Sequence, residues 1–148
     1  MINELKILYK RDFNLWTERM AIAIEYRNMS EIDWENLLVE IECMGDSLKS
    51  FLENQLGKLI EYILKLQYWQ EERDLNYRYW QFKVVSSRTQ IKRLLKRNPS
   101  LEIYLIEVYS EIFEDTITSV RFLFEVPQNS FIEQRQIMEQ DYFGDVNM

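Results

Sequence analysis

The feature that most constrains this fold is a long run of apolar residues spaced by three and four positions. The run extends from Leu37 to Leu66. Its members are Leu37, Ile41, Met44, Leu48 and Phe51 and, after a slip of one residue, Leu52, Leu56, Leu59, Ile63 and Leu66. Because an α-helix turns once in about 3.6 residues, this spacing places the apolar side chains in one stripe along one helix. The stripe predicts a long helix from about Asp33 to Tyr68.

Gly45 lies beside this stripe. A glycine inside a helix costs about 1 kcal/mol relative to alanine. We favour a continuous helix, because a break would usually reset the apolar phase. The alternative is two helices that meet at residues 45–47. A glycine here lets another helix approach closely, so we expect Gly45 to be a packing position.

The rest of the chain predicts more helices and few loops. The 148 residues include only three Gly and two Pro, whereas turn-rich β architectures need many more of both. Helical spacing marks three further segments, residues 13–26, 77–97 and 101–126. Residues 70–76 are predicted to be a polar connection. We therefore predict an all-α fold with a single domain over residues 1–148. It is a helical bundle of four main helices built on the long central helix, with a short packed C-terminal segment.

The counts of histidine and cysteine exclude several kinds of catalytic and metal site and bear on the compartment. Histidine is absent, which excludes Ser-His-Asp and Cys-His catalysis and zinc sites that use imidazole. Cys43 is the only cysteine, so no intrachain disulfide forms, which fits a reducing compartment. No apolar run reaches the length of a membrane span, and the first residues show no signal-peptide pattern. We expect a cytoplasmic protein with no cofactor, no metal and no membrane contact.

Acidic residues flank the stripe at the start of the long helix. Asp33 and Glu40 fall on one flank, and Glu42 falls on the other. A carboxylate-metal enzyme could use them as ligands or as an acid/base pair. We favour a structural role, in which Asp33 caps the helix while Glu40 and Glu42 pair with arginines, since helix starts favour acids anyway. Arg88, three residues before Ile91 and near the buried stripe, is the best candidate partner.

Positive charge is concentrated in residues 75–100. This segment contains seven basic residues and no acidic one, so in a chain of net charge −7 the remainder carries −14. A helix with a basic outer face could bind nucleic acid through its phosphates, with Lys92, Lys96 and Arg97 as candidate residues. We favour internal neutralisation against the acidic helices, and net charge gives the chain no affinity for a polyanion.

Three tryptophans are predicted to be packing anchors. Trp16, Trp34 and Trp80 occur at helical spacing with other apolar residues.

The apolar stripe of the long helix is longer than the shorter neighbouring helices can cover, which indicates a further partner. The natural partner is a second copy, so we expect a homo-oligomer, most simply a dimer, or a complex with another protein. The favoured function is a non-catalytic interaction module, with nucleic-acid binding and metal-dependent catalysis as alternatives.

Three blocks of the sequence resemble one family. The blocks are Asp12-Phe13 with Trp16-Thr17; Asp33-Trp34-Glu35-Asn36-Leu37 with Glu40-Ile41-Glu42 and Met44-Gly45; and Trp80, Arg88, Ile91, Leu94-Leu95 and Asn98-Pro99-Ser100-Leu101. In this order, from residue 9 to about 143, they are similar to the small bacterial proteins, often cyanobacterial, grouped as domain of unknown function 29. Leu66 and Gln70 depart from the pattern, which more often shows Trp and Pro there. The resemblance implies an all-helical fold and no assigned activity.

Overall fold

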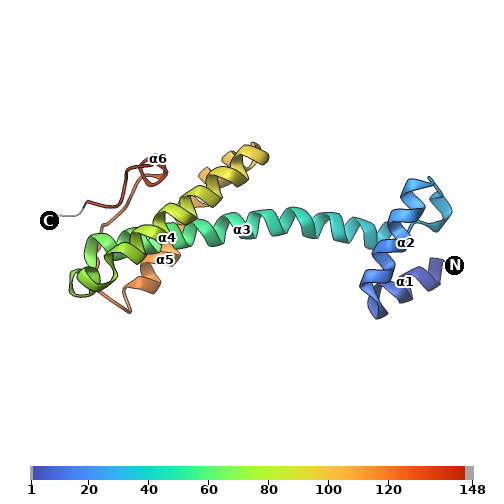
Figure 1. Ribbon diagram of the computed structural model, residues 1–148, viewed down its shortest axis with the longest axis horizontal. Coiled ribbons are helices and arrows are strands. Elements are labelled where there is room, and N and C mark those ends of the chain that lie inside the picture. Colours follow the sequence, from blue (N-terminus) through green and yellow to red (C-terminus); the bar gives the residue numbers. More distant parts are fainter. Residues whose placement is uncertain (1, 146–148) are drawn as a thin grey trace. The chain divides into compact units, whose positions relative to one another are not determined.

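A computed structural model describes residues 2–145, and all regular structure in that range is helical (Figure 1). The elements are α1 (Ile2–Arg11), α2 (Phe13–Glu25), the 3₁₀ helix η1 (Met29–Glu31), α3 (Trp34–Tyr68), α4 (Gln70–Arg97), α5 (Leu101–Val120) and α6 (Gln134–Ile137). The predicted all-α fold built on one long helix is confirmed, and α3 passes Gly45 without a break. None of the helices described has both the length and the apolarity needed to cross a membrane.

The chain divides into two compact units. Unit 1 comprises Met1–Ser47 and unit 2 comprises Leu48–Met148, so the boundary falls within α3. Each unit has its own cluster of buried apolar side chains. The single domain over residues 1–148 stays a prediction.

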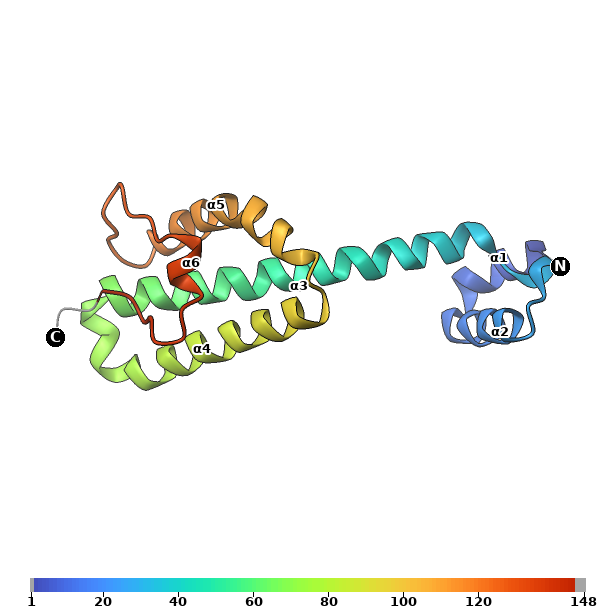
Figure 2. The same ribbon diagram turned by 90° about the horizontal axis from the view of Figure 1, so that it is seen from above.

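Unit 2 is a bundle in which α3 lies between α4 and α5 (Figure 2). Its core includes one apolar stripe of α3 whose side chains are at most 1% exposed: Leu52, Leu56, Leu59, Ile63 and Leu66. Trp80 of α4 and Phe113 of α5 are buried against this stripe. A Cβ added to Gly57 would lie 3.8 Å from Thr116 Oγ1 and 4.0 Å from Ile112 Cγ2, so α5 approaches α3 closely at this glycine.

The segment after α5 packs onto unit 2, as predicted, and a buried arginine holds it. Arg88 is 3% exposed, and its guanidinium donates to the carbonyl oxygens of Ile137 (3.0 Å), Gln140 (3.1 Å) and Tyr142 (2.7 Å). Burial lowers the pKa of Arg88. Hydrogen bonds from a charged donor offset the cost of burying that charge, because three main-chain acceptors replace water.

The polar connection predicted at residues 70–76 is wrong, because these residues form the first two turns of α4. Only Trp69 separates α3 from α4. Two glutamates occupy the first turn of α4, where the helix dipole favours negative charge. Arg73 donates to the carbonyl oxygen of Gln67 (3.0 Å), which satisfies a free acceptor at the end of α3. The polarity of this segment reflects a helix that is largely exposed.

Unit 1 packs α1 and α2 against the first turns of α3 (Figure 1). Its core is small and consists of Leu5, Trp16, Met20, Ala23 and Ile32. Asp12 caps α2, because its Oδ1 accepts from the main-chain amide of Leu15 at 3.0 Å. Leu37 of α3 is half-buried against this core.

The end of α2 has a left-handed residue, Arg27, with φ of 55°. The amide of Arg27 donates to Ile24 O (3.1 Å) and the amide of Asn28 donates to Ala23 O (2.8 Å), which is the pattern of a Schellman motif. Glycine is the residue that usually occupies this position, because any other L-residue pays about 1–2 kcal/mol there. Unit 1 therefore accepts backbone strain where the chain turns from α2 toward η1.

Candidate functional site

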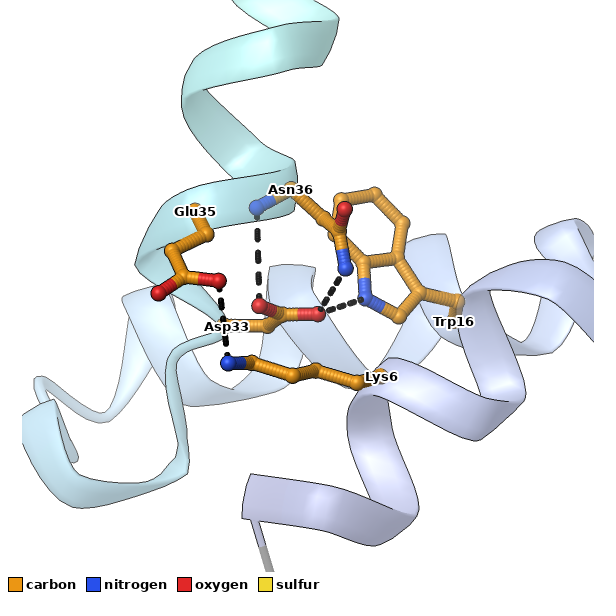
Figure 3. Close-up of polar contacts among 5 residues, drawn as sticks. All are labelled: Lys6, Trp16, Asp33, Glu35 and Asn36. Atoms are coloured by element: carbon orange, nitrogen blue, oxygen red, sulfur yellow. Dashed lines mark hydrogen bonds and ion pairs between the residues drawn. The ribbon is translucent and has the colours of Figure 1, made fainter.

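A buried carboxylate, that of Asp33, lies at the centre of the polar contacts of unit 1. Figure 3 shows it between the indole of Trp16 and the side chain of Asn36. Asp33 is 1% exposed, and its Oδ2 accepts from Trp16 Nε1 (3.2 Å) and from Asn36 Nδ2 (2.7 Å). Its Oδ1 lies 3.5 Å from the main-chain amide of Asn36, in the position of a helix cap. Both oxygens are therefore engaged in holding the start of α3.

Trp16 joins this carboxylate to an aromatic cluster. The indole is 2% exposed, and its ring centroid lies 4.9 Å from Tyr9, edge-on, and 5.6 Å from Phe13, stacked. Aromatic pairs of this kind contribute about 0.5–1.5 kcal/mol beyond their buried area. Trp16 thus connects α1, α2 and the start of α3 through one side chain.

Two further contacts join α1 to α3. The Tyr9 hydroxyl donates to the Glu40 carboxylate, and this hydrogen bond raises the pKa of Tyr9 to about 12. Lys6 Nζ lies 2.9 Å from Glu35 Oε2 (Figure 3), and this hydrogen bond raises the pKa of Lys6. Both contacts orient α1 on α3 at the surface of unit 1.

The acidic residues do not assemble a metal site. Among the residues that the structure describes, no group of three or more His, Cys, Asp or Glu side chains is placed to hold a metal ion. Asp33 is saturated by Trp16 and Asn36, and Glu40 accepts from Tyr9. The carboxylates of this cluster hold α1 and α2 onto α3, which is a structural task.

The predicted pairing of Glu40 and Glu42 with Arg88 is wrong. Nε, Nη1 and Nη2 of Arg88 all donate to main-chain carbonyls of the C-terminal segment. Glu40 is bonded to Tyr9 instead, and Glu42 is exposed. A buried guanidinium needs acceptors, and the free carbonyls at the end of α6 and just after it provide them as well as a carboxylate does.

A strip of exposed apolar side chains runs along α3 within unit 1. Its exposed fractions are 57% for Trp34, 57% for Leu38, 56% for Ile41 and 66% for Met44. Gly45 lies on the same side of the helix, and a Cβ added there would meet nothing within 4 Å. We call these five residues the α3 strip. Trp34 and Gly45 are therefore not packed against another helix within unit 1, and their predicted packing roles stay predictions.

The reason for this exposure is the flank of α3 that α1 and α2 cover. Asn36, Leu37 and Glu40 contact unit 1 through hydrogen bonds or its apolar core. Asn36 and Glu40 lie on the neighbouring flank of the helix, and Leu37 lies at the edge of the α3 strip next to that flank. By contrast, residues in line with the strip are buried from Leu52 onward, where α4 and α5 provide cover. The strip is core-like in composition and spacing but uncovered.

Unit 2 carries a second exposed surface, on α4. Leu75, Tyr79 and Phe82 are 88%, 54% and 63% exposed, and Arg93 and Arg97 are also exposed. Their spacing of four, three, eleven and four residues places them on one side of the helix. We call these five residues the α4 face. The wrong prediction of a polar connection at residues 70–76 left Leu75 out of this helix, although its spacing to Tyr79 and Phe82 is helical.

The basic residues of α4 form no ion pair with another described residue. The two side-chain ion pairs between described residues are Lys6–Glu35 and Lys65–Glu61, and neither involves α4. The predicted internal neutralisation stays a prediction, with no ion pair of α4 in its support. The candidate nucleic-acid residues Lys92, Lys96 and Arg97 are all exposed.

Comparison with known proteins gives one match. A family model described as domain of unknown function DUF29 matches residues 8–143, which is nearly the whole chain. Comparisons with curated proteins and with solved structures find no match.

Proposed function

This chain belongs to the DUF29 family, whose description names no activity, and we propose that it is a non-catalytic interaction module that self-associates through the α3 strip. The observation that carries the proposal is the strip itself. Four large apolar side chains stand in line on one helix, and each is more than half exposed. Contiguous apolar surface of this kind marks interaction sites in proteins.

The energetics support association through this surface. Complete burial of one Leu, Ile or Met side chain is worth about 1.5–3 kcal/mol relative to exposure. The strip is already half-exposed and rigid, since the aromatic cluster and the Asp33 cap fix the first turns of α3. A partner therefore gains apolar contact without first ordering the helix, which lowers the entropic cost of binding.

The alternatives have weaker support. A nucleic-acid role would use Lys92, Lys96 and Arg97, but the net charge of −7 repels a polyanion. A metal-dependent enzyme would need a set of oxygen ligands, and two of the three candidate carboxylates, Asp33 and Glu40, are committed to Trp16, Asn36 and Tyr9. An interaction role needs only the exposed apolar surface.

We assign this role to a homodimer in a bacterial cytoplasm. The support for the compartment is indirect and comes from Cys43, an exposed free thiol. A reducing environment keeps such a thiol unpaired, whereas an oxidising one favours intermolecular disulfides.

The test is the oligomeric state of three proteins, measured by sedimentation equilibrium with light scattering. They are the wild-type chain, the variant Leu38→Ser/Ile41→Ser, and the matched control Val39→Ser. Val39 is also exposed (44%), but it lies two residues from Ile41 and so on nearly the opposite side of α3.

We expect a concentration-dependent dimer for the wild type and the control. The double variant should raise the dissociation constant by about tenfold or more, since each 1.4 kcal/mol of lost burial is a factor of about ten. A wild type that is monomeric at high micromolar concentration would contradict the proposal, and so would equal weakening by Val39→Ser.

A further inference from the structure

We propose that a hollow between α4, α5 and α6 binds a small organic phosphate that carries an apolar group. The hollow lies entirely within unit 2 and has a volume of about 420 Å³. Ligand pockets usually measure about 300–1,000 Å³, so this one suits a small ligand. The site does not involve the α3 strip, which lies in unit 1, so it stands or fails separately from the proposed self-association.

The apolar part of the lining belongs largely to the core of unit 2. Leu105 of α5 is buried, and Leu95 of α4 and Met138 after α6 are half-buried against the same core. Pro99, in the connection between α4 and α5, is also part of the lining. These side chains give an apolar group of the ligand a surface on which to lose its contact with water.

The charged part of the lining is mainly basic. Lys92 and Lys96 of α4 line the hollow, and neither forms an ion pair with another described residue. Residues 75–100 contain no acid, so their own segment of α4 does not offset these charges. Glu102, the single acid of the lining, lies in the first turn of α5, where the helix dipole compensates a negative charge. The hollow therefore offers two unpaired ammonium groups to an anion.

The spacing of the two lysines favours a phosphate over a carboxylate. Residues four apart on a helix have Cβ atoms about 5–6 Å from each other, so both ammonium groups can reach one anionic group. A phosphate monoester carries a charge of about −1.5 to −2 at pH 7, whereas a carboxylate carries a single charge. The side-chain amide of Gln134, also in the lining, adds a neutral donor.

Hydrogen bonds and a proline of the chain itself hold the lining in place. Arg88 donates to the carbonyl oxygens of Ile137 (3.0 Å) and Gln140 (3.1 Å). These carbonyls lie on either side of Met138 in the chain, so this part of the lining is held against α4. Elsewhere in the lining, the ring of Pro99 restricts the connection between α4 and α5. A site that is already ordered loses less entropy when it binds a ligand.

The experiment measures the binding of 1-naphthyl phosphate by isothermal titration calorimetry at about 0.15 M salt. Inorganic phosphate and 1-naphthol, titrated separately, represent its anionic part and its apolar part. The test variant is Lys92→Gln/Lys96→Gln. The matched control, Arg93→Gln/Arg97→Gln, removes the same charge at the same spacing from exposed residues of α4 that lie outside the lining. Circular dichroism checks that both variants fold.

We expect the wild type and the arginine control to bind 1-naphthyl phosphate with dissociation constants that agree within about threefold, because salt screens charges outside the hollow. The lysine variant should bind about tenfold more weakly or worse, because it loses hydrogen bonds to a charged group. Inorganic phosphate and 1-naphthol should each bind the wild type about tenfold more weakly than the ester, since each makes only part of the contact.

Three results would overturn the inference. The first is no binding of 1-naphthyl phosphate at about millimolar concentration. The second is equal weakening by the lysine and arginine variants, which indicates attraction by overall charge alone. The third is loss of binding in Leu38→Ser/Ile41→Ser with the lysine variant unaffected, which assigns the naphthyl group to the α3 strip. None of these results changes the oligomeric state by which the proposed function is tested.

A comparison with octyl phosphate identifies the kind of apolar group. Tighter binding of octyl phosphate than of 1-naphthyl phosphate assigns an alkyl chain, as in a phosphate derived from a lipid. Tighter binding of 1-naphthyl phosphate assigns a ring, as in a free aryl phosphate. Both results support the inference, provided that the lysine variant weakens the tighter ligand by about tenfold or more.

A titration with single-stranded DNA at two salt concentrations tests the competing occupant. Nucleic acid contacts basic residues all along the exposed side of a helix, whereas the hollow uses only the two lysines. Salt-sensitive DNA binding that displaces 1-naphthyl phosphate, and that the lysine and arginine variants weaken alike, would assign Lys92 and Lys96 to nucleic acid and overturn the inference.

Discussion

Replacing Gly45 by alanine should stabilise the monomer and weaken the proposed dimer. Gly45 lies in the interior of α3, 11 residues from its first residue, and a Cβ added there meets nothing within 4 Å. Alanine is about 1 kcal/mol better than glycine in a helix interior, and it also reduces the freedom of the unfolded chain. With no clash to subtract, we expect the free energy of unfolding to rise by about 1 kcal/mol.

The dimer should respond in the opposite direction. A methyl group on the α3 strip keeps a partner helix from approaching as closely as it does over glycine. The expected loss is about tenfold in the dimerisation constant, from an overpacking cost of about 1–3 kcal/mol. Urea unfolding at a concentration where the chain is monomeric gives the free energy of unfolding. Sedimentation gives the dimerisation constant.

The matched control is Gly57→Ala in the same helix. Its Cβ would make ordinary contacts with α5, at 3.8 Å from Thr116 Oγ1 and 4.0 Å from Ile112 Cγ2. It should therefore stabilise the monomer by a similar amount and leave dimerisation unchanged. A Gly45→Ala protein that is less stable than wild type would refute the interpretation of the strip as open space. Unchanged dimerisation would remove Gly45 from the contact.

Four other outcomes follow from the structure. Arg27→Gly should raise the free energy of unfolding by about 1 kcal/mol in urea, because glycine adopts φ of 55° without strain; a loss would mean that the Arg27 side chain stabilises unit 1. Trp16→Phe removes a donor to the buried Asp33 carboxylate and should cost about 2 kcal/mol, measured the same way against the surface change Ile24→Leu, at an exposed residue of the same helix. Arg88→Lys keeps the charge but loses most of three hydrogen bonds, so limited proteolysis should cut the segment after α5 faster than in wild type. Burial raises the pKa of Tyr142 from 10.0 to about 12, so this group should leave stability unchanged below pH 10 and reduce it as pH rises from 10 to 12, which urea titrations at a series of pH values would detect.

The long helix could be predicted from the sequence because its signal is local. Apolar spacing of three and four fixes a helix wherever it persists, and α3 ends at Tyr68 as predicted. The cap at Asp12 was also predictable, since a carboxylate before an apolar-periodic segment satisfies free amides of the next turn. These features depend on residues within one or two turns of each other.

The partners of charged groups depend on residues far apart in the chain and could not be predicted in this way. Arg88 bonds to carbonyls about 50 positions later, and a carbonyl leaves no mark in a sequence. Glu40 bonds to Tyr9 across 31 positions, in a contact that a search for opposite charges would pass over. Within the chain, close approach at a helical glycine occurs at Gly57, where α5 packs on α3.

The α3 strip differs from the rest of the α3 stripe in what covers it. Only Trp69 separates α3 from α4, so α4 begins at the C-terminal end of α3, and with α5 it buries the side chains of the stripe from Leu52 to Leu66. In unit 1 the apolar spacing continues through side chains that are more than half exposed. An apolar stripe that extends beyond its cover is under the same hydrophobic drive as a core, which is why we propose that a second molecule buries it.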